Sequence, residues 1–239
     1  IFNTTGGSNC AFGNQSLLQN TTASNNTAFG SSALKENTTG TNNVGIGNAS
    51  LGANTTASNN TAVGYLSLHA NTTGTFNTAV GINSSRSLTT GSYNTVIGGN
   101  SLYNATAAGF NTAQGVAALF ATTTGSNNTA IGYESLQQNT TASNNTALGY
   151  QSLKANTTGT NTAVGSIALD ANTTGTANSA FGRDALGANT TGGSNVAVGQ
   201  SSLANNTTAS NNVAVGNSAL LSNTTGINNV SVGMQCLKD

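Results

Sequence analysis

The chain has 239 residues, of which only 4% are charged, and its formal net charge is zero. This balance excludes the basic groove of a nucleic-acid-binding protein, and no apolar run approaches the roughly 18 residues of a membrane span. Asn, Thr, Ser and Gly are abundant, as in disordered linkers, but apolar residues recur here in a fixed register that such linkers lack, so we expect an ordered repeat protein.

A pentapeptide of the form Asn-Thr-Ala-Val-Gly, as at residues 60–64, returns about every seventeen residues. Fourteen copies align on their glycine, and the one sixteen-residue step, from Gly149 to Gly165, has a loop at 156–161 that is one residue short. A change confined to a loop is expected to leave the strands in register. We call the aligned residues corner glycines and the chain from one to the next a coil; they are Gly13, Gly30, Gly47, Gly64, Gly81, Gly98, Gly115, Gly132, Gly149, Gly165, Gly182, Gly199, Gly216 and Gly233.

Three other positions are nearly uniform. An asparagine stands four residues before every corner glycine. The residue directly before the glycine is aliphatic or Phe, with Gln114 as the exception, and the residue four positions after it is leucine, with Ser85 as the exception. Asn tolerates the left-handed backbone and can bond to its copies above and below, so a structural role is favoured over a row of ligands. The structural rows are represented by Asn26, Asn60, Asn94, Asn128, Gly30, Gly64, Gly98, Gly132, Leu34, Leu68, Leu102 and Leu136.

Seventeen residues are too few for a helical repeat, so the period predicts two short strands per coil in an all-β fold. At residues 61–63 the Ala should face one way and its neighbours the other. After Gly64, a second short strand should begin at Ser67 and Leu68, and the polar loop 71–75 returns the chain. Stacking about fourteen such coils at about 4.8 Å would form a parallel β-solenoid that buries the Val and Leu rows. Because one roll is thin, we expect three to associate around an axis.

Neither end of the sequence resembles a cap, so we expect residues 1–239 to form one repetitive β-roll segment of a longer fibre. Cys10 and Cys236 belong to the first and last coils, which are too far apart for a disulfide if the coils stack. We expect two unpaired, buried thiols, with pairing between chains as the alternative.

The corner pentapeptide resembles the head repeats of YadA-type trimeric autotransporter adhesins, most closely at residues 195–199 and 212–216, which both read Asn-Val-Ala-Val-Gly. The chain is still more similar to the Asn-Thr-Ala-x-Gly repeats of phage tail fibres and related surface proteins. This resemblance implies a left-handed β-roll, a homotrimer, an extracellular location on a cell or virion surface, and binding to a host or matrix receptor, either a glycan or a protein. The repeat is longer here, so no binding residues of those adhesins are carried over.

No arrangement of residues predicts an enzyme. His69 is the single histidine, and neither a Cys-x-x-Cys motif nor a Ser/His/acid set occurs. We therefore expect no catalytic residues, no metal and no cofactor.

The most irregular part of the sequence extends from Gly81 to Gly132. Its coils lose the loop asparagine, at Leu88, Ala105 and Thr122. Aromatic residues accompanied by Arg are favoured at binding hot spots, so this stretch is a candidate binding patch, with drift of the repeat as the alternative. The candidate patch comprises Arg86, Tyr93, Tyr103, Phe110, Gln114 and Phe120.

The sequence favours a structural and adhesive fibre segment. An ice-binding solenoid is the first alternative, because Thr-Thr pairs such as Thr55-Thr56 and Thr72-Thr73 would stack into an uncharged array. A surface filament assembled end to end is the second.

Overall fold

A computed structural model describes residues 3–237, which fall into two compact units, unit 1 ending at Thr124 and unit 2 beginning at Gly125. Ile1, Phe2, Lys238 and Asp239 lie outside the described residues. The expectation of one uncapped segment depends on these ends and stays a prediction.

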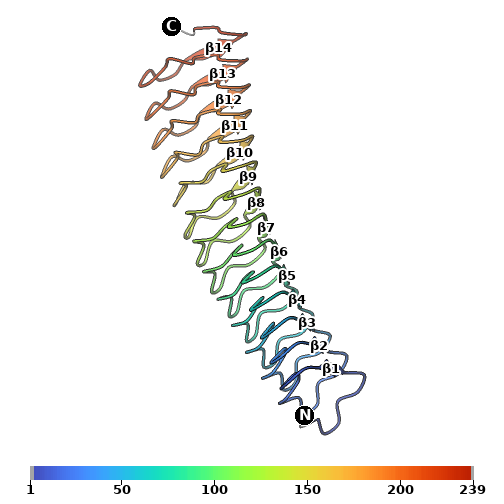
Figure 1. The fold of residues 1–239 in the computed structure, drawn as a ribbon. Coiled ribbons are helices and arrows are strands. Elements are labelled where there is room, and N and C mark those ends of the chain that lie inside the picture. Colours follow the sequence, from blue (N-terminus) through green and yellow to red (C-terminus); the bar gives the residue numbers. More distant parts are fainter. Residues whose placement is uncertain (1–2, 238–239) are drawn as a thin grey trace. The chain divides into compact units, whose positions relative to one another are not determined.

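Each unit is a stack of three-residue parallel strands that follow one another in sequence order (Figure 1). Residues 3–237 contain no helix, and so none that could cross a membrane. The prediction of an all-β parallel solenoid is therefore confirmed. Unit 1 contains β1 (Cys10–Phe12), β2 (Thr27–Phe29), β3 (Val44–Ile46), β4 (Thr61–Val63), β5 (Thr78–Val80), β6 (Thr95–Ile97) and β7 (Thr112–Gln114). Unit 2 contains β8 (Thr129–Ile131), β9 (Thr146–Leu148), β10 (Thr162–Val164), β11 (Ser179–Phe181), β12 (Val196–Val198), β13 (Val213–Val215) and β14 (Val230–Val232).

The strands are in register at the repeat period. In unit 1, Ala62 pairs with Ala79, one period along the chain. In unit 2, Ala163 pairs with Ala147 across the shortened loop and with Ala180 across a full one. The missing residue therefore leaves the strand register intact, as the sequence predicts.

The strand side chains alternate between interior and surface. Ala62, in the middle of β4, is fully buried, whereas Thr61 and Val63 on either side are partly exposed. The interior consists of the leucine row, the small strand residues and buried polar side chains. The expectation that the Val row shares the core with the Leu row is wrong. The central residue of each strand faces the interior, so the member of the Val row next to it, like every neighbour along a strand, faces the opposite side.

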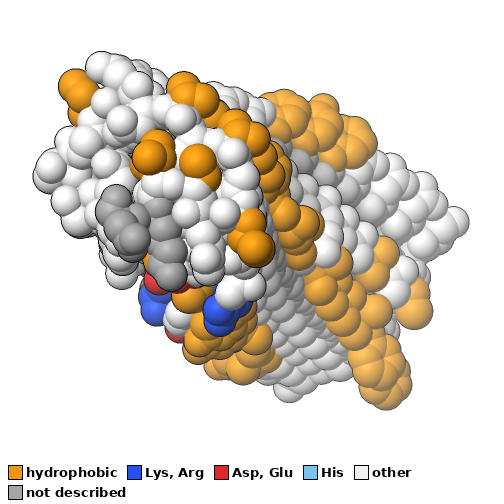
Figure 2. Space-filling view, turned by 90° about the horizontal axis from the view of Figure 1, so that it is seen from above, with side chains coloured by type: hydrophobic (Ala, Val, Ile, Leu, Met, Phe, Trp, Pro, Cys, Tyr) orange, Lys and Arg blue, Asp and Glu red, His pale blue; other side chains and the backbone are white. Residues whose placement is uncertain are grey.

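The residues directly before the corner glycines consequently form rows on the surface, which we call the strand row of each unit. In unit 1, Phe12 and Phe29 are 65% and 52% exposed and stack with 4.8 Å between ring centroids. Figure 2 shows hydrophobic side chains gathered in such surface rows. Each unit therefore presents an uncovered apolar strip.

The predicted second strand at Ser67 and Leu68 is also wrong. The chain forms consecutive turns after the corner glycine, with positive φ at every second residue: 134° at Gly64, 52° at Leu66 and 48° at Leu68. The backbone amides still pair between coils, because Leu66 N donates to Asn48 O and Leu68 N to Ser84 O, at 3.0 and 2.9 Å. A left-handed residue costs about 1–2 kcal/mol, and burial of a leucine, worth about 1.5–3 kcal/mol, offsets this cost.

Two ladders of buried asparagines brace the loops. In the first, Asn26 Nδ2 donates to Gly40 O at 2.9 Å, and Asn26 Oδ1 accepts the backbone N–H of Asn43 at 2.9 Å. In the second, Asn37 Nδ2 donates to the same Gly40 carbonyl at 3.0 Å, and Asn37 Oδ1 accepts from Asn54 Nδ2 at 2.7 Å. These amides are occupied by the protein itself.

Both cysteines are free, as predicted, but neither is buried. Cys10 is exposed and Cys236 is partly exposed. Cys10 is the first residue of β1, where the alternation of the strand turns its side chain outward.

Candidate functional site

The structure divides the predicted binding patch into separate rows. Tyr93 and Phe110 belong to the loop before the strand, whereas Arg86, Tyr103 and Phe120 each follow a corner glycine by five residues. No ring contact or hydrogen bond joins the two groups in the described part of the chain. Gln114 is partly exposed in the strand row of β7.

Tyr93 and Phe110 are joined by Phe76, which the sequence analysis missed. We call these three rings the aromatic ladder. Phe76 and Tyr93 are each 51% exposed, and Phe110 is 61% exposed. The centroids are 5.2 Å apart between Phe76 and Tyr93 and 4.9 Å apart between Tyr93 and Phe110, with the planes within 8° of parallel. Because the ring faces cover one another, the ladder presents mainly ring edges to solvent.

The aromatic ladder occupies an unfavourable backbone position. Phe76, Tyr93 and Phe110 have φ of 56°, 61° and 58°, and Asn25 and Asn59 hold the same position in other coils at 61° and 62°. Asn tolerates this left-handed conformation, whereas for a bulky residue it is an outlier. Leu66 and Leu68 adopt the same conformation, so the left-handed backbone is a regular feature of the coils and does not by itself mark the ladder as a functional site.

The second group extends into a longer row on unit 1. The fifth residues after successive corner glycines include Lys35, Gly52, His69, Arg86, Tyr103 and Phe120, here the basic-aromatic row. Arg86 Nη1 donates to the Tyr103 hydroxyl, and its guanidinium lies 5.7 Å from the Tyr103 ring centroid. Tyr103 stacks on Phe120 with a centroid separation of 5.3 Å. The row combines cations and aromatic rings on one side of the coils.

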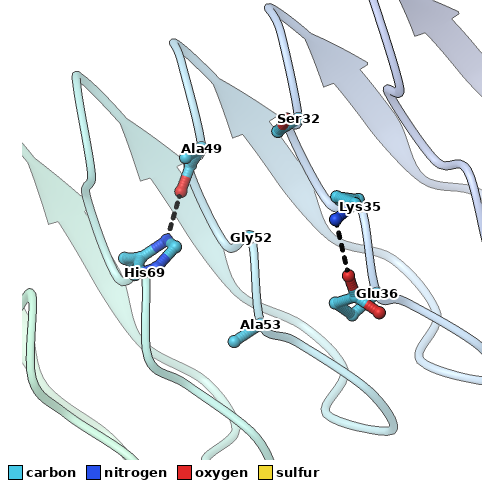
Figure 3. A pocket seen from close by; sticks show the side chains of 7 residues that line it. All are labelled: Ser32, Lys35, Glu36, Ala49, Gly52, Ala53 and His69. Carbon is cyan, nitrogen blue, oxygen red and sulfur yellow. Dashed lines mark hydrogen bonds and ion pairs between the residues drawn. The ribbon is translucent and has the colours of Figure 1, made fainter.

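A hollow of about 350 Å³ interrupts this row where Gly52 lacks a side chain (Figure 3). The Lys35 ammonium pairs with the Glu36 carboxylate at 3.1 Å on one side of the hollow. On the other side, His69 Nδ1 lies 3.0 Å from Ala49 O. The hollow is lined by Ser32, Lys35, Glu36, Ala49, Gly52, Ala53 and His69.

Unit 2 carries an ionic cluster of its own. Glu134 accepts hydrogen bonds from Lys154 Nζ at 2.7 Å and Gln151 Nε2 at 2.8 Å. These two contacts lower the pKa of Glu134 from 4.5 to about 2, and the hydrogen bond from Lys154 has the larger effect. A hydrogen bond with Glu134 raises the pKa of Tyr133, whose ring stacks on Tyr150 at 5.6 Å. Glu134 and Lys154 were not predicted from the sequence to form this cluster.

Within residues 3–237, no three His, Cys, Asp or Glu side chains gather closely enough to hold a metal ion. The exposed features described above are apolar strips, stacked rings and a charged hollow. A scan against protein-family models and searches of curated proteins and of solved structures found no match.

Proposed function

We propose that the chain is a rigid shaft or head segment of an adhesive extracellular fibre, on a cell surface or a virion. In this proposal, three copies of a left-handed β-roll associate side by side through their strand rows, and other exposed rows contact a host or matrix surface.

The observation that carries the proposal is the exposure of the strand row. Ile46 and Ile97 in unit 1 are 38% and 44% exposed, and Leu148 and Phe181 in unit 2 are 43% and 42% exposed. Soluble monomers rarely leave large contiguous apolar patches uncovered, so an extended strip indicates an interaction surface.

A second copy of the chain is the occupant that fits this strip best. Its own strand row repeats at the same spacing of about 4.8 Å, so apolar side chains can interdigitate along the whole contact. The row has no charged member in β1 to β14, so no ion has to be desolvated. Three copies around a common axis would each cover part of the other two, and the resemblance to trimeric adhesin repeats supports this number over two.

The oligomeric mass tests the proposal. Sedimentation equilibrium at micromolar concentrations should give three times the chain mass of 23.5 kDa. The double variant Ile46→Lys/Ile97→Lys adds two charges to the strand row and should sediment as a monomer. Its matched control, Thr56→Lys/Thr90→Lys, adds the same charge at exposed loop positions and should stay trimeric.

Circular dichroism would establish that both double variants remain folded. A monomeric wild type, or a strand-row variant that remains a trimer, would overturn the proposed association.

The ice-binding alternative stays a prediction. Thr38 Oγ1 donates to Thr55 O at 3.0 Å, so the first hydroxyl of this Thr pair is engaged within the protein. The second, at Thr39, is exposed. Thermal hysteresis at millimolar protein concentration would test this alternative.

A further inference from the structure

We propose that the hollow over Gly52 binds a neutral hexopyranose unit of a surface glycan. This inference rests on the proposed adhesive function and adds to it a ligand class and a site.

The hollow exists because a single short residue stands between longer ones. Lys35 and His69 belong to coils on either side of Gly52, so their backbones are separated by about 10 Å, twice the strand spacing. The bond to Ala49 O holds the imidazole over the glycine, since a Cβ on Gly52 would lie 2.9 Å from His69 Nδ1. A hollow of about 350 Å³ remains beside the imidazole.

The lining of the hollow matches the two-sided chemistry of a pyranose. Ala49 and Ala53 are partly exposed and provide an apolar surface for the C–H face of the ring, whereas Gly52 is buried next to the imidazole; polar side chains stand around this surface (Figure 3). The Glu36 carboxylate accepts hydrogen bonds and the Lys35 ammonium donates them, so adjacent sugar hydroxyls could bond to both. A pocket that combines an apolar surface with a few converging polar groups is typical of small-ligand sites.

His69 adds a directed acceptor. The Ala49 carbonyl can only accept, so the 3.0 Å contact assigns the imidazole proton to Nδ1. In this tautomer of the uncharged ring, Nε2 can accept a hydroxyl hydrogen.

The charges of the hollow favour a neutral ligand. Lys35 and Glu36 form an ion pair, with side chains 34% and 36% exposed, so the rim carries both signs in balance. An anionic sugar could pair with Lys35 only by displacing the Glu36 carboxylate, and a cationic amino sugar with Glu36 only by displacing the Lys35 ammonium. Like charges in contact disfavour both classes.

Binding to a single hollow should be weak, because it is open to solvent. With three copies in one fibre, simultaneous attachment could raise the avidity by a factor on the order of 10² or more where the spacing of the glycans allows it.

The test measures binding of the methyl glycosides of glucose, galactose and mannose by isothermal titration and saturation-transfer NMR. At least one should bind the wild type with millimolar Kd, at least tenfold tighter than methyl glucuronide and glucosamine. Gly52→Gln fills the hollow and should weaken binding at least tenfold. Gly187→Gln is its matched control, since Gly187 also follows its corner glycine by five residues but lies in unit 2.

Glu36→Gln keeps the shape of the rim but removes its negative charge, so it should reduce the discrimination against methyl glucuronide. The thermal melting of each variant would establish that it is folded. Wild-type protein that binds none of the three glycosides at tens of millimolar, or Gly52→Gln protein that binds like the wild type, overturns the site. Equal binding of charged and neutral sugars overturns the ligand class.

The same samples separate this inference from the proposed assembly. A monomer that binds a glycoside would overturn only the trimer, whereas a trimer that binds none would overturn only the sugar site.

Discussion

Ser85 and Leu88 reverse the order of apolar and polar side chains found in the preceding coil, where leucine holds the first of these two positions and asparagine the second. In that coil Leu68 and Asn71 are both fully buried, and Asn71 N donates to Leu68 O at 3.2 Å. The same bond joins Leu88 N to Ser85 O at 3.2 Å, and both side chains are again buried. The backbone is therefore preserved, but Ser85 Oγ and Asn71 Oδ1 are left buried without a hydrogen-bond partner among the described residues.

Reversing the exchange should stabilise unit 1. In the double variant Ser85→Leu/Leu88→Asn, leucine returns to its row and the new amide can donate to Asn71 Oδ1. A buried unsatisfied group costs about 1–3 kcal/mol, so the free energy of unfolding should rise by about this amount. Urea unfolding followed by circular dichroism would measure the change.

The single variants of this pair are the controls. Leu88→Asn alone leaves the coil without a buried leucine and should cost about 2–5 kcal/mol. Ser85→Leu alone places two leucines in one coil and should cost about 1–3 kcal/mol through overpacking. A double variant less stable than the wild type would show that the exchange is not a local defect.

The same substitution should destabilise the protein strongly at Gly98 and hardly at all at its neighbour Gly99. Gly98 has a φ of 137°, and a Cβ there would lie 2.5 Å from Gly115 O and 2.7 Å from Gly115 C. At Gly99 the nearest atom is the flexible Ile82 Cγ2 at 3.2 Å. Gly98→Ala should cost more than about 2 kcal/mol, since it combines backbone strain with a clash against the next coil. Gly99→Ala should stay within about 1 kcal/mol of the wild type.

Chemical denaturation of these two variants would measure the difference. Equal stability would mean that the corner glycines are not required for the stacking of the coils.

Asn60 and Asn59 form a second matched pair. Asn60 is fully buried, donates to Gly74 O at 2.9 Å and accepts the backbone N–H of Asn77 at 2.9 Å. Asn60→Asp replaces the donor by a carboxylate oxygen that faces a carbonyl, and it should cost at least about 3 kcal/mol at neutral pH. Asn59→Asp changes an exposed residue at a φ of 62° that Asp tolerates, and should be nearly neutral.

The cost of Asn60→Asp should fall in acid, where a protonated carboxyl can again donate. Thermal melting at several pH values would measure this change, and a variant as stable as the wild type at neutral pH would argue against a role of the Asn60 donor.

Acid should weaken unit 2 through Glu134. Its pKa is about 2 in the folded chain against an ordinary value of 4.5. Because the folded pKa is the lower one, the stabilisation is fully present above pH 4.5 and is lost as the pH falls from 4.5 to about 2. Glu134→Gln should flatten the stability profile across this window. Lys154→Met removes the strongest cause of the shift and should flatten it similarly, whereas an unchanged slope in both variants would contradict the assignment.

The period and strand register follow from the sequence because each side chain has to match the copy one coil away. The second strand could not be predicted correctly. Leu68 adopts a left-handed φ of 48°, which a leucine disfavours locally, because this conformation buries its side chain in the stack. The hollow depends on how His69 leans over Gly52, which no spacing in the sequence encodes. Phe76, by contrast, could have been found, because it lies one period before Tyr93.

The aromatic ladder gives the sharpest test of a localised function. Tyr93→Asn installs the residue that holds the same position at Asn25 and Asn59. It removes two ring stacks worth about 0.5–1.5 kcal/mol each and relieves a left-handed tyrosine that costs about 1–2 kcal/mol. The two effects nearly cancel, so the free energy of unfolding should change by less than about 1 kcal/mol.

Attachment to the host or matrix surface should nevertheless weaken at least tenfold in Tyr93→Asn, because the substitution breaks the centre of the ladder. Thr73→Asn, at an exposed position of the preceding loop, is the control and should attach normally. Unfolding curves and surface-binding assays on the same preparations separate the two roles. If attachment is unchanged while stability falls by several kcal/mol, the rings serve the packing of the loops and the ladder is not a binding surface.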